Sequence, residues 1–152
     1  MQYAFVLGRV YTLSLAELFY YFERYNIELS IIDASPEVLI IETEGQLDAQ
    51  KIQRELGGTV KILRVVDAVP KRELDSINFA LQNYFKPSKI KTDFLKNYKG
   101  KIQFGVSVYL LDGNLRPFGE PKRLGMYIKR AMQDSGASIR LVLPEFNGLA
   151  LA

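Results

Sequence analysis

The chain has 152 residues, of which 48% are hydrophobic and 24% charged, so it can bury a sizeable core as one domain or as two small ones. It contains no cysteine and no histidine, which excludes disulfides, thiolate catalysis, cysteine-rich zinc sites and the usual general base near neutral pH. No apolar run approaches the roughly 20 residues that span a bilayer. Because the N-terminus also lacks the features of a secretory signal, we expect a cytoplasmic protein with no membrane partner.

Charge divides the chain into two halves of opposite sign. Residues 1–69 contain 6 Lys and Arg and 10 Asp and Glu, a net charge of −4, whereas residues 70–152 contain 14 and 7, a net charge of +7. Clustered Lys and Arg neutralise phosphates and release condensed counterions, which supplies most of the non-specific affinity for nucleic acids. The second half is therefore predicted to bind a polyanion.

The first half has the pattern of a β-α-β-β-α-β unit. The predicted strands cover residues 3–7, 27–32, 38–41 and 59–66, and one helix follows the first strand while another follows the third. Two βαβ halves in this order form a ferredoxin-like unit. We therefore predict an α+β fold with a ferredoxin-like domain over residues 1–69.

Three local signals predict where the two helices of this unit begin and end. Ser14 and Glu17 are spaced as a capping box, which predicts that the first helix begins there. Asp48 is placed to cap the second helix. Gly57 and Gly58 provide a left-handed residue to end it.

The second half is predicted to contain α/β structure in which two helices begin at prolines. Pro70 opens a helix that ends before residue 87, and Pro121 opens a helix that ends at Gly136. Strands are predicted over residues 102–111 and 139–143, with a tight turn at residues 112–113.

Most basic residues of the second half form the candidate phosphate-binding set. Residues 86–101 contain six lysines, one acid and interleaved aromatic residues, as in channels that bind single strands. In the helix that begins at Pro121, cations repeat at seven residues, so two turns bring each pair onto one face about 10 Å apart. A solvated surface face is the alternative for both segments, and the aromatic side chains could instead pack in the core. The full set is Lys86, Lys89, Lys91, Lys96, Lys99, Lys101, Arg116, Lys122, Arg123, Lys129, Arg130 and Arg140; we predict no catalytic and no metal-binding residue.

Several segments match a known family in order and spacing. They are Tyr3-Ala4-Phe5-Val6-Leu7-Gly8-Arg9, Leu13-Ser14-Leu15-Ala16-Glu17-Leu18, Leu56-Gly57-Gly58-Thr59-Val60-Lys61-Ile62, Phe104-Gly105-Val106-Ser107-Val108-Tyr109, Ile128-Lys129-Arg130 and Ala137-Ser138-Ile139-Arg140-Leu141-Val142. The first three resemble the start of archaeal and eukaryotic tRNA guanosine N2-methyltransferases and of their bacterial relatives, the RNA or DNA methylases. The last three resemble the core of the THUMP domain that follows in those enzymes.

This resemblance implies a ferredoxin-like domain and a THUMP-like domain, residues 70–152, that together bind the acceptor end of tRNA. The methyltransferase domain that would hold S-adenosylmethionine carries an Asn/Asp-Pro-Pro-Tyr/Phe motif, and this chain has no Pro-Pro pair and no cofactor loop. The chain also stops before the last strands of a THUMP domain. We therefore expect an incomplete THUMP-like domain and an N-terminal piece of a longer enzyme.

The sequence thus predicts a non-catalytic tRNA-recognition region, without a cofactor of its own, that presents its substrate to a methyltransferase domain of the same polypeptide. One alternative is a ferredoxin-like regulatory module that binds a small molecule between paired sheets. Another is an enzyme of the acylphosphatase type, which has an arginine near the first helix. Arg9 occupies that place, but no partner asparagine lies at a matching position.

Overall fold

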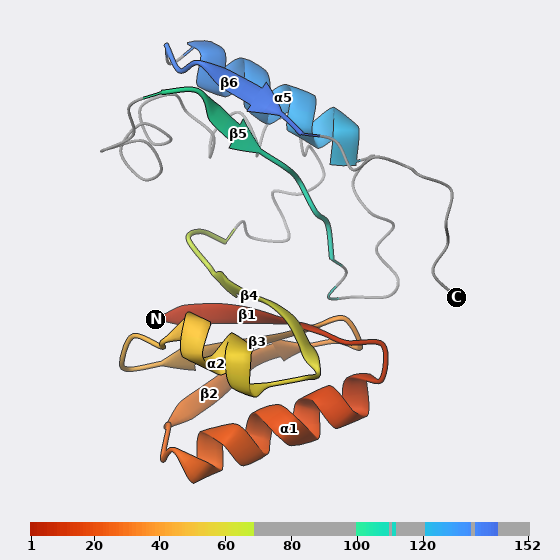
Figure 1. Cartoon of the computed structure of the whole chain (residues 1–152), viewed down its shortest axis with the longest axis vertical. Coiled ribbons are helices and arrows are strands. Elements are labelled where there is room, and N and C mark those ends of the chain that lie inside the picture. Colours follow the sequence, from red (N-terminus) through yellow and green to blue (C-terminus); the bar gives the residue numbers. More distant parts are fainter. Residues whose placement is uncertain (69–99, 110, 112–120, 135, 143–152) are drawn as a thin grey trace. The chain divides into compact units, whose positions relative to one another are not determined.

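The computed structural model describes residues 1–68, 100–109, 111, 121–134 and 136–142 (Figure 1). The chain forms two compact units. The first contains Met1–Ala68 together with Tyr109 and Leu111, and the second contains the other described residues.

The first unit is a four-stranded sheet with two helices. In chain order its elements are β1 (Gln2–Leu7), α1 (Tyr11–Arg24), β2 (Leu29–Ala34), β3 (Val38–Thr43), α2 (Ala49–Glu55) and β4 (Thr59–Arg64). The strands lie in the order β2-β3-β1-β4, and all neighbours are antiparallel. The predicted order of strands and helices over residues 1–69 is confirmed, and the protein is of mixed α and β structure.

The main core lies between the sheet and its helices, which cover the same face (Figure 1). Successive side chains of a strand point to opposite faces, so Tyr3, Phe5 and Leu7 point towards the helices. There Phe5 meets Phe22 of α1 in an edge-to-face contact, with ring centroids 5.6 Å apart. Leu18, one turn earlier in α1, is fully buried in the same cluster.

The opposite face of the sheet carries a smaller apolar cluster. Ala4, Val6 and Val38 are buried there, and Tyr109 packs against them from far along the chain. The ammonium group of Lys61 lies 5.9 Å from the centre of the Tyr109 ring. Tyr109 therefore belongs to the first unit, which the sequence pattern did not indicate because the residue lies within the strand predicted over residues 102–111.

Helix α1 begins four residues earlier than the capping-box pattern predicted, since its N-cap is Val10 and not Ser14. Tyr11 is its first residue, and no side chain caps it at Val10. Ser14 lies within the helix, where its amide donates to the Val10 carbonyl oxygen at 3.2 Å. The predicted capping box does not form, because the side chains of Ser14 and Glu17 have hydrogen-bond partners elsewhere in the unit. The Ser14 hydroxyl accepts the Gly8 amide at 3.2 Å, and the Glu17 carboxylate accepts two amides of the loop before β4.

Helix α2 begins as the sequence predicted and ends differently. Asp48 caps it, accepting the Lys51 amide at 2.9 Å, which satisfies one of the free amides of the first turn. The chain leaves the helix in an extended conformation at Leu56. Neither Gly57 nor Gly58 is left-handed, so the predicted glycine cap is wrong.

The described part of the second unit is a parallel strand pair packed on one helix. Strands β5 (Ile102–Phe104) and β6 (Ile139–Leu141) are parallel neighbours, and α5 (Pro121–Asp134) packs on them. The strand predicted over residues 102–111 is much shorter, since residues 105–109 form no ladder. The predicted start of α5 at Pro121 is confirmed.

Gly136 ends α5 as predicted. Its backbone has a φ of 84°, a left-handed conformation that glycine adopts without strain. The Ala137 amide then donates to the Met132 carbonyl oxygen at 3.2 Å, which is the hydrogen bond of a Schellman motif. No helix among the described residues is both long enough and apolar enough to cross a bilayer.

Candidate nucleic-acid interface

Helix α5 presents one apolar face and one basic face. Met132 and Ile139 are buried together, and Ile128 and Ala131 pack against them. Gly125 allows the helix to lie close to β6, because a methyl group there would be 2.7 Å from Leu141 Cδ1. The side of α5 that faces away from the strands is left for charged residues.

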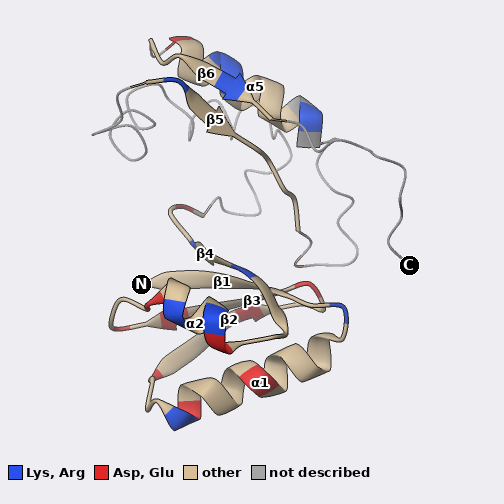
Figure 2. Ribbon diagram, viewed as in Figure 1, with Lys and Arg blue, Asp and Glu red and all other residues tan. Residues whose placement is uncertain are grey.

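The structure places the described cations of α5 on this outer side. Lys122 and Arg130 are exposed and Lys129 is half-buried. At 3.6 residues per turn, Lys122 and Lys129 lie within about 20° of each other around the axis and about 10 Å apart along it. Figure 2 shows Lys and Arg as blue segments along α5, and the one acidic residue in the sequence of this helix is Asp134. Within the described part of the chain none of the three cations forms an ion pair.

Arg140 lies on the other side of this unit. Ile139 of β6 packs with α5, and Leu141 contacts it at Gly125, so the alternation of the strand directs Arg140 away from the helix. Arg140 is exposed and is paired in register with Gln103 of β5. The fold therefore separates Arg140 from the cations of α5. Lys101, just before β5, is also exposed.

Residues Lys86, Lys89, Lys91, Lys96, Lys99 and Arg116 lie outside the described residues, and so do the predicted helix after Pro70 and the turn at residues 112–113. Arg123 lies within α5, and its side chain is outside the described part.

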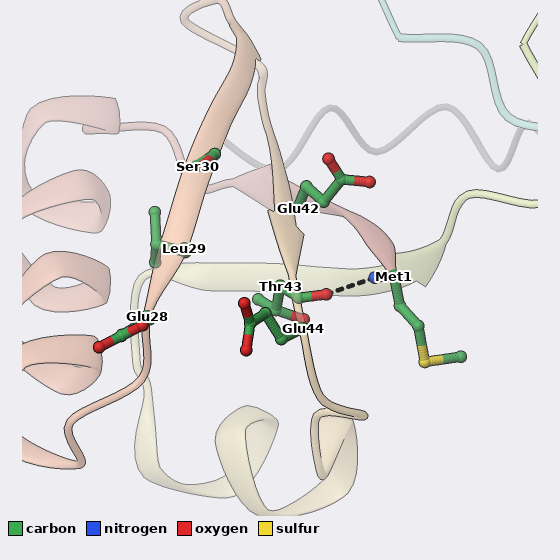
Figure 3. Close-up of a pocket in the computed structure, with 7 residues that line it drawn as sticks. All are labelled: Met1, Glu28, Leu29, Ser30, Glu42, Thr43 and Glu44. Atoms are coloured by element: carbon green, nitrogen blue, oxygen red, sulfur yellow. Dashed lines mark hydrogen bonds between the residues drawn. The ribbon is translucent and has the colours of Figure 1, made fainter.

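The first unit has an acidic hollow of about 520 Å³ where β2 begins and β3 ends (Figure 3). Glu28, Glu42 and Glu44 line it, and the N-terminal amine of Met1 donates to the Thr43 carbonyl oxygen beside them. Negative charge of this density repels phosphate. Among the described residues, no group of acidic side chains has the arrangement needed to hold a metal ion.

A second hollow, of about 500 Å³, lies between the end of α1 and the start of α2. Tyr21 and Tyr25 line it with their ring centroids 4.5 Å apart, and the Lys51 ammonium lies 4.3 Å from the centre of the Tyr25 ring. Burial raises the pKa of Tyr21 above its ordinary value of 10.0, and the nearby Glu55 carboxylate raises it further. This hollow combines aromatic surface with one cation and several acids.

Tyr25 is expected to ionise at a higher pH than a free tyrosine. Its hydroxyl donates to Glu55 Oε2 at 2.8 Å, and this hydrogen bond raises the pKa of Tyr25 above 10.0. The folded state then holds this proton more tightly than the unfolded state. The resulting stabilisation is complete below pH 10.0 and is lost as the pH rises through the folded-state pKa.

An alkaline titration followed by tyrosinate absorbance checks this expectation. Tyr25→Phe should remove a late-ionising group, and Glu55→Gln should move that group to lower pH, whereas Glu23→Gln in the last turn of α1, two residues before Tyr25, should leave the curve unchanged. An unaltered titration in Glu55→Gln would show that the hydrogen bond does not control this proton.

We compared the chain with protein-family models, with curated proteins and with solved structures, and none of the three comparisons finds a match.

Proposed function

We propose that this chain is the non-catalytic tRNA-recognition region of an S-adenosylmethionine-dependent RNA methyltransferase of the cytoplasm. It holds phosphates of the acceptor stem and the 3′ end and presents the substrate to a methyltransferase domain of the same polypeptide, which binds the cofactor. The observation that carries this proposal is the set of described cations on α5. Lys122 and Lys129 lie nearly in line along the helix, and the exposed Arg130 lies about 100° around the axis from Lys129.

The chemistry of this face suits a phosphate backbone better than base edges. Lys122 and Lys129 are spaced about 10 Å along the helix, and Arg130 adds a guanidinium that can bind a phosphate through two parallel hydrogen bonds. A-form RNA hides its base edges in a deep, narrow groove, so proteins recognise it mainly by shape and backbone contacts. We expect the interface to discriminate poorly between sequences of the same shape.

The architecture of the first unit supports the same proposal. Its strand order is β4-β1-β3-β2 with β-α-β-β-α-β connections, and we propose that it is a ferredoxin-like unit followed by a THUMP-like domain. The acidic hollow and the net charge of residues 1–69 favour a spacer role for this unit rather than direct contact with phosphate.

Salt titration of tRNA binding by the whole chain tests the proposal. If three α5 cations each contact a phosphate, log Kd should rise with log salt with a slope of about 2 to 3. The double variant Lys129→Ala/Arg130→Ala should weaken binding about tenfold at low salt and reduce the slope by about 2, because two contacts are lost.

A matched control removes one lysine and one arginine from α2. Lys51 and Arg54 are both exposed on that helix of the first unit. Lys51→Ala/Arg54→Ala should therefore leave the slope unchanged. A slope near zero for the unaltered chain, or an equal loss in both double variants, would contradict the proposal.

The alternative of a small-molecule regulatory module is favoured by the hollow between α1 and α2. Tyr21 and Tyr25 offer aromatic surface to a small ligand there, beside Lys51. A thermal-shift screen of amino acids and nucleotides tests it. A ligand that raises Tm in the unaltered chain but not in Tyr25→Ala would support a module of this type, and the absence of any stabilising ligand would remove it.

A further inference from the structure

The hollow between α1 and α2 has an apolar floor. Ile52 is 2% exposed there, and Ile27 and Leu47 beside it are half-buried. The volume of the hollow, about 500 Å³, lies within the range of roughly 300 to 1,000 Å³ that small-molecule sites occupy. Such a floor can bury the hydrocarbon part of a ligand, which a merely charged patch of surface cannot do.

The rim of the hollow is acidic. Glu28, Glu44 and Asp48 line it and are exposed, and Lys51 is the one cation among the described residues that line it. Three carboxylates and one ammonium give the rim a net charge of −2. This charge attracts a cationic ligand and repels a phosphate.

Tyr21 brings a hydroxyl without a partner to the same hollow. The side chain is only 6% exposed, and its ring packs against Phe22 and Tyr25 with centroids 6.2 and 4.5 Å away. Its hydroxyl forms no hydrogen bond with another residue in the described part of the chain, although Tyr21 lines the hollow. Nearly all buried polar side chains have a hydrogen-bond partner. A ligand that donates a hydrogen bond would supply one here.

Tyr25 already holds a cation at this place. The Lys51 ammonium lies 4.3 Å from the centre of the Tyr25 ring, a distance typical of a cation–π contact. The hydrogen bond from the Tyr25 hydroxyl to Glu55 fixes the orientation of the ring. Because the stem of a lysine is flexible, an ammonium group of a ligand can displace Lys51 from this position.

The segments that form the rim are fixed by hydrogen bonds and by one special backbone conformation. The Thr43 hydroxyl donates to the Gly45 carbonyl oxygen at 2.7 Å, and the Leu47 amide donates to the Tyr3 hydroxyl at 3.1 Å. On the other side, Asn26 has a φ of 50°, which turns the chain from α1 towards β2. A rim that is ordered before binding loses little further entropy when a ligand enters.

We propose that this hollow binds an aliphatic diamine. The methylene chain of the ligand lies on the apolar floor. One ammonium group takes the place of the Lys51 ammonium beside Tyr25 and donates to the Tyr21 hydroxyl, which can accept a hydrogen bond. The other ammonium group lies at the carboxylates of Glu28 and Glu44. A single inorganic cation would leave the floor unused.

Titration of the isotope-labelled whole chain with putrescine, a diamine with a four-carbon chain, tests the proposal without RNA. Amide chemical shifts should change at residues that line the hollow, such as Asn26, Gly45 and Lys51. Butylamine, which lacks one charge, should bind about three- to fivefold more weakly, and uncharged butanediol should not bind.

Three variants separate the contributions to binding. Tyr21→Phe removes only the hydroxyl and should weaken putrescine binding about threefold. Asp48→Asn removes one charge but keeps the cap of α2, because asparagine caps as well as aspartate, and should weaken binding about three- to fivefold. Lys51→Ala should strengthen binding by a similar factor, because it removes a like charge and frees the ring of Tyr25.

The matched control is Glu42→Gln, which removes a carboxylate that lines the neighbouring acidic hollow (Figure 3) but not this one. It should leave putrescine binding unchanged. The proposal would be overturned if millimolar putrescine shifted none of the amides that line the hollow, or if Glu42→Gln weakened binding as much as Asp48→Asn. Weaker binding in Lys51→Ala would also overturn it. Because no RNA is present, each of these results is independent of the proposed recognition of tRNA.

Discussion

Gly58→Ala is expected to lower the free energy of unfolding by about 2 to 3 kcal/mol, an effect typical of adding atoms to a tightly packed site. The added Cβ would lie 2.8 Å from Ser14 Oγ and 2.9 Å from Ser14 Cα. Because the second of these is a backbone atom of α1, rotation of a side chain cannot relieve the contact. Urea denaturation followed by circular dichroism measures the loss.

The neighbouring glycine provides the control for this change. A Cβ on Gly57 would have its nearest contact 3.6 Å away, at Glu17 Oε1, and a Cβ on Gly45 would meet nothing within 4 Å. Neither residue has a positive φ. Gly57→Ala and Gly45→Ala should therefore stay within about 0.5 kcal/mol of the unaltered chain. Equal losses in Gly57→Ala and Gly58→Ala would show that the close approach of Gly58 to Ser14 does not determine the effect, because the entropy of the unfolded chain favours alanine at both positions.

Glu17→Ala is expected to cost about 2 to 3 kcal/mol of stability. The two oxygens of the Glu17 carboxylate accept the Gly57 amide at 2.9 Å and the Gly58 amide at 2.7 Å. Hydrogen bonds to a charged acceptor contribute more than neutral ones, and removing the acceptor leaves the partly buried Gly58 amide without its partner. These bonds join the middle of α1 to the loop between α2 and β4. The same urea experiment measures their contribution.

Two further variants of α1 make this prediction specific. Glu17→Gln keeps the shape and one oxygen acceptor but places an NH₂ group near the second amide, so it should lose about half as much stability as Glu17→Ala. Glu23→Ala removes an exposed carboxylate from the same helix and should change stability by no more than about 0.5 kcal/mol. If Glu23→Ala were as harmful as Glu17→Ala, the effect would belong to helix charge and not to these two hydrogen bonds.

The junction around Ser14 also bears on the acylphosphatase-type alternative. The Gly8 amide, which precedes α1, donates to the Gly58 carbonyl oxygen at 2.8 Å and to Ser14 Oγ at 3.2 Å. It is therefore engaged within the fold and is not directed at a ligand. Arg9 is exposed beside it. The glycines of this region serve close packing between β1, α1 and β4, not the binding of an anion.

The candidate interface was predictable in part because helical periodicity alone brings Lys122 and Lys129 to one face. Whether that face looks outwards depends on Met132, Ile128 and the strands they pack against, which is a property of the packed unit. Arg140 shows where prediction from the sequence failed to group the cations correctly. Its charge placed it in the same candidate set, but the alternation of β6 directs it away from α5.

What the sequence by itself determined is the succession of elements in the first unit and the ends of α5. Local chemistry is sufficient for these: Asp48 accepts an amide three residues away, and Gly136 adopts a left-handed backbone that most other residues avoid.

Only the tertiary structure decided the roles of Ser14, Glu17 and Gly58. Their spacing along the chain satisfies the rules for a capping box and a glycine cap. In the fold, however, Glu17 accepts the amides of Gly57 and Gly58, 40 and 41 residues away, and Ser14 accepts the amide of Gly8. A polar side chain is drawn to whichever unsatisfied backbone group the packed fold brings nearest, because leaving such a group buried without a partner costs more than forgoing a local bond. Which backbone group each of these side chains binds is therefore decided only when β1, α1 and β4 pack together.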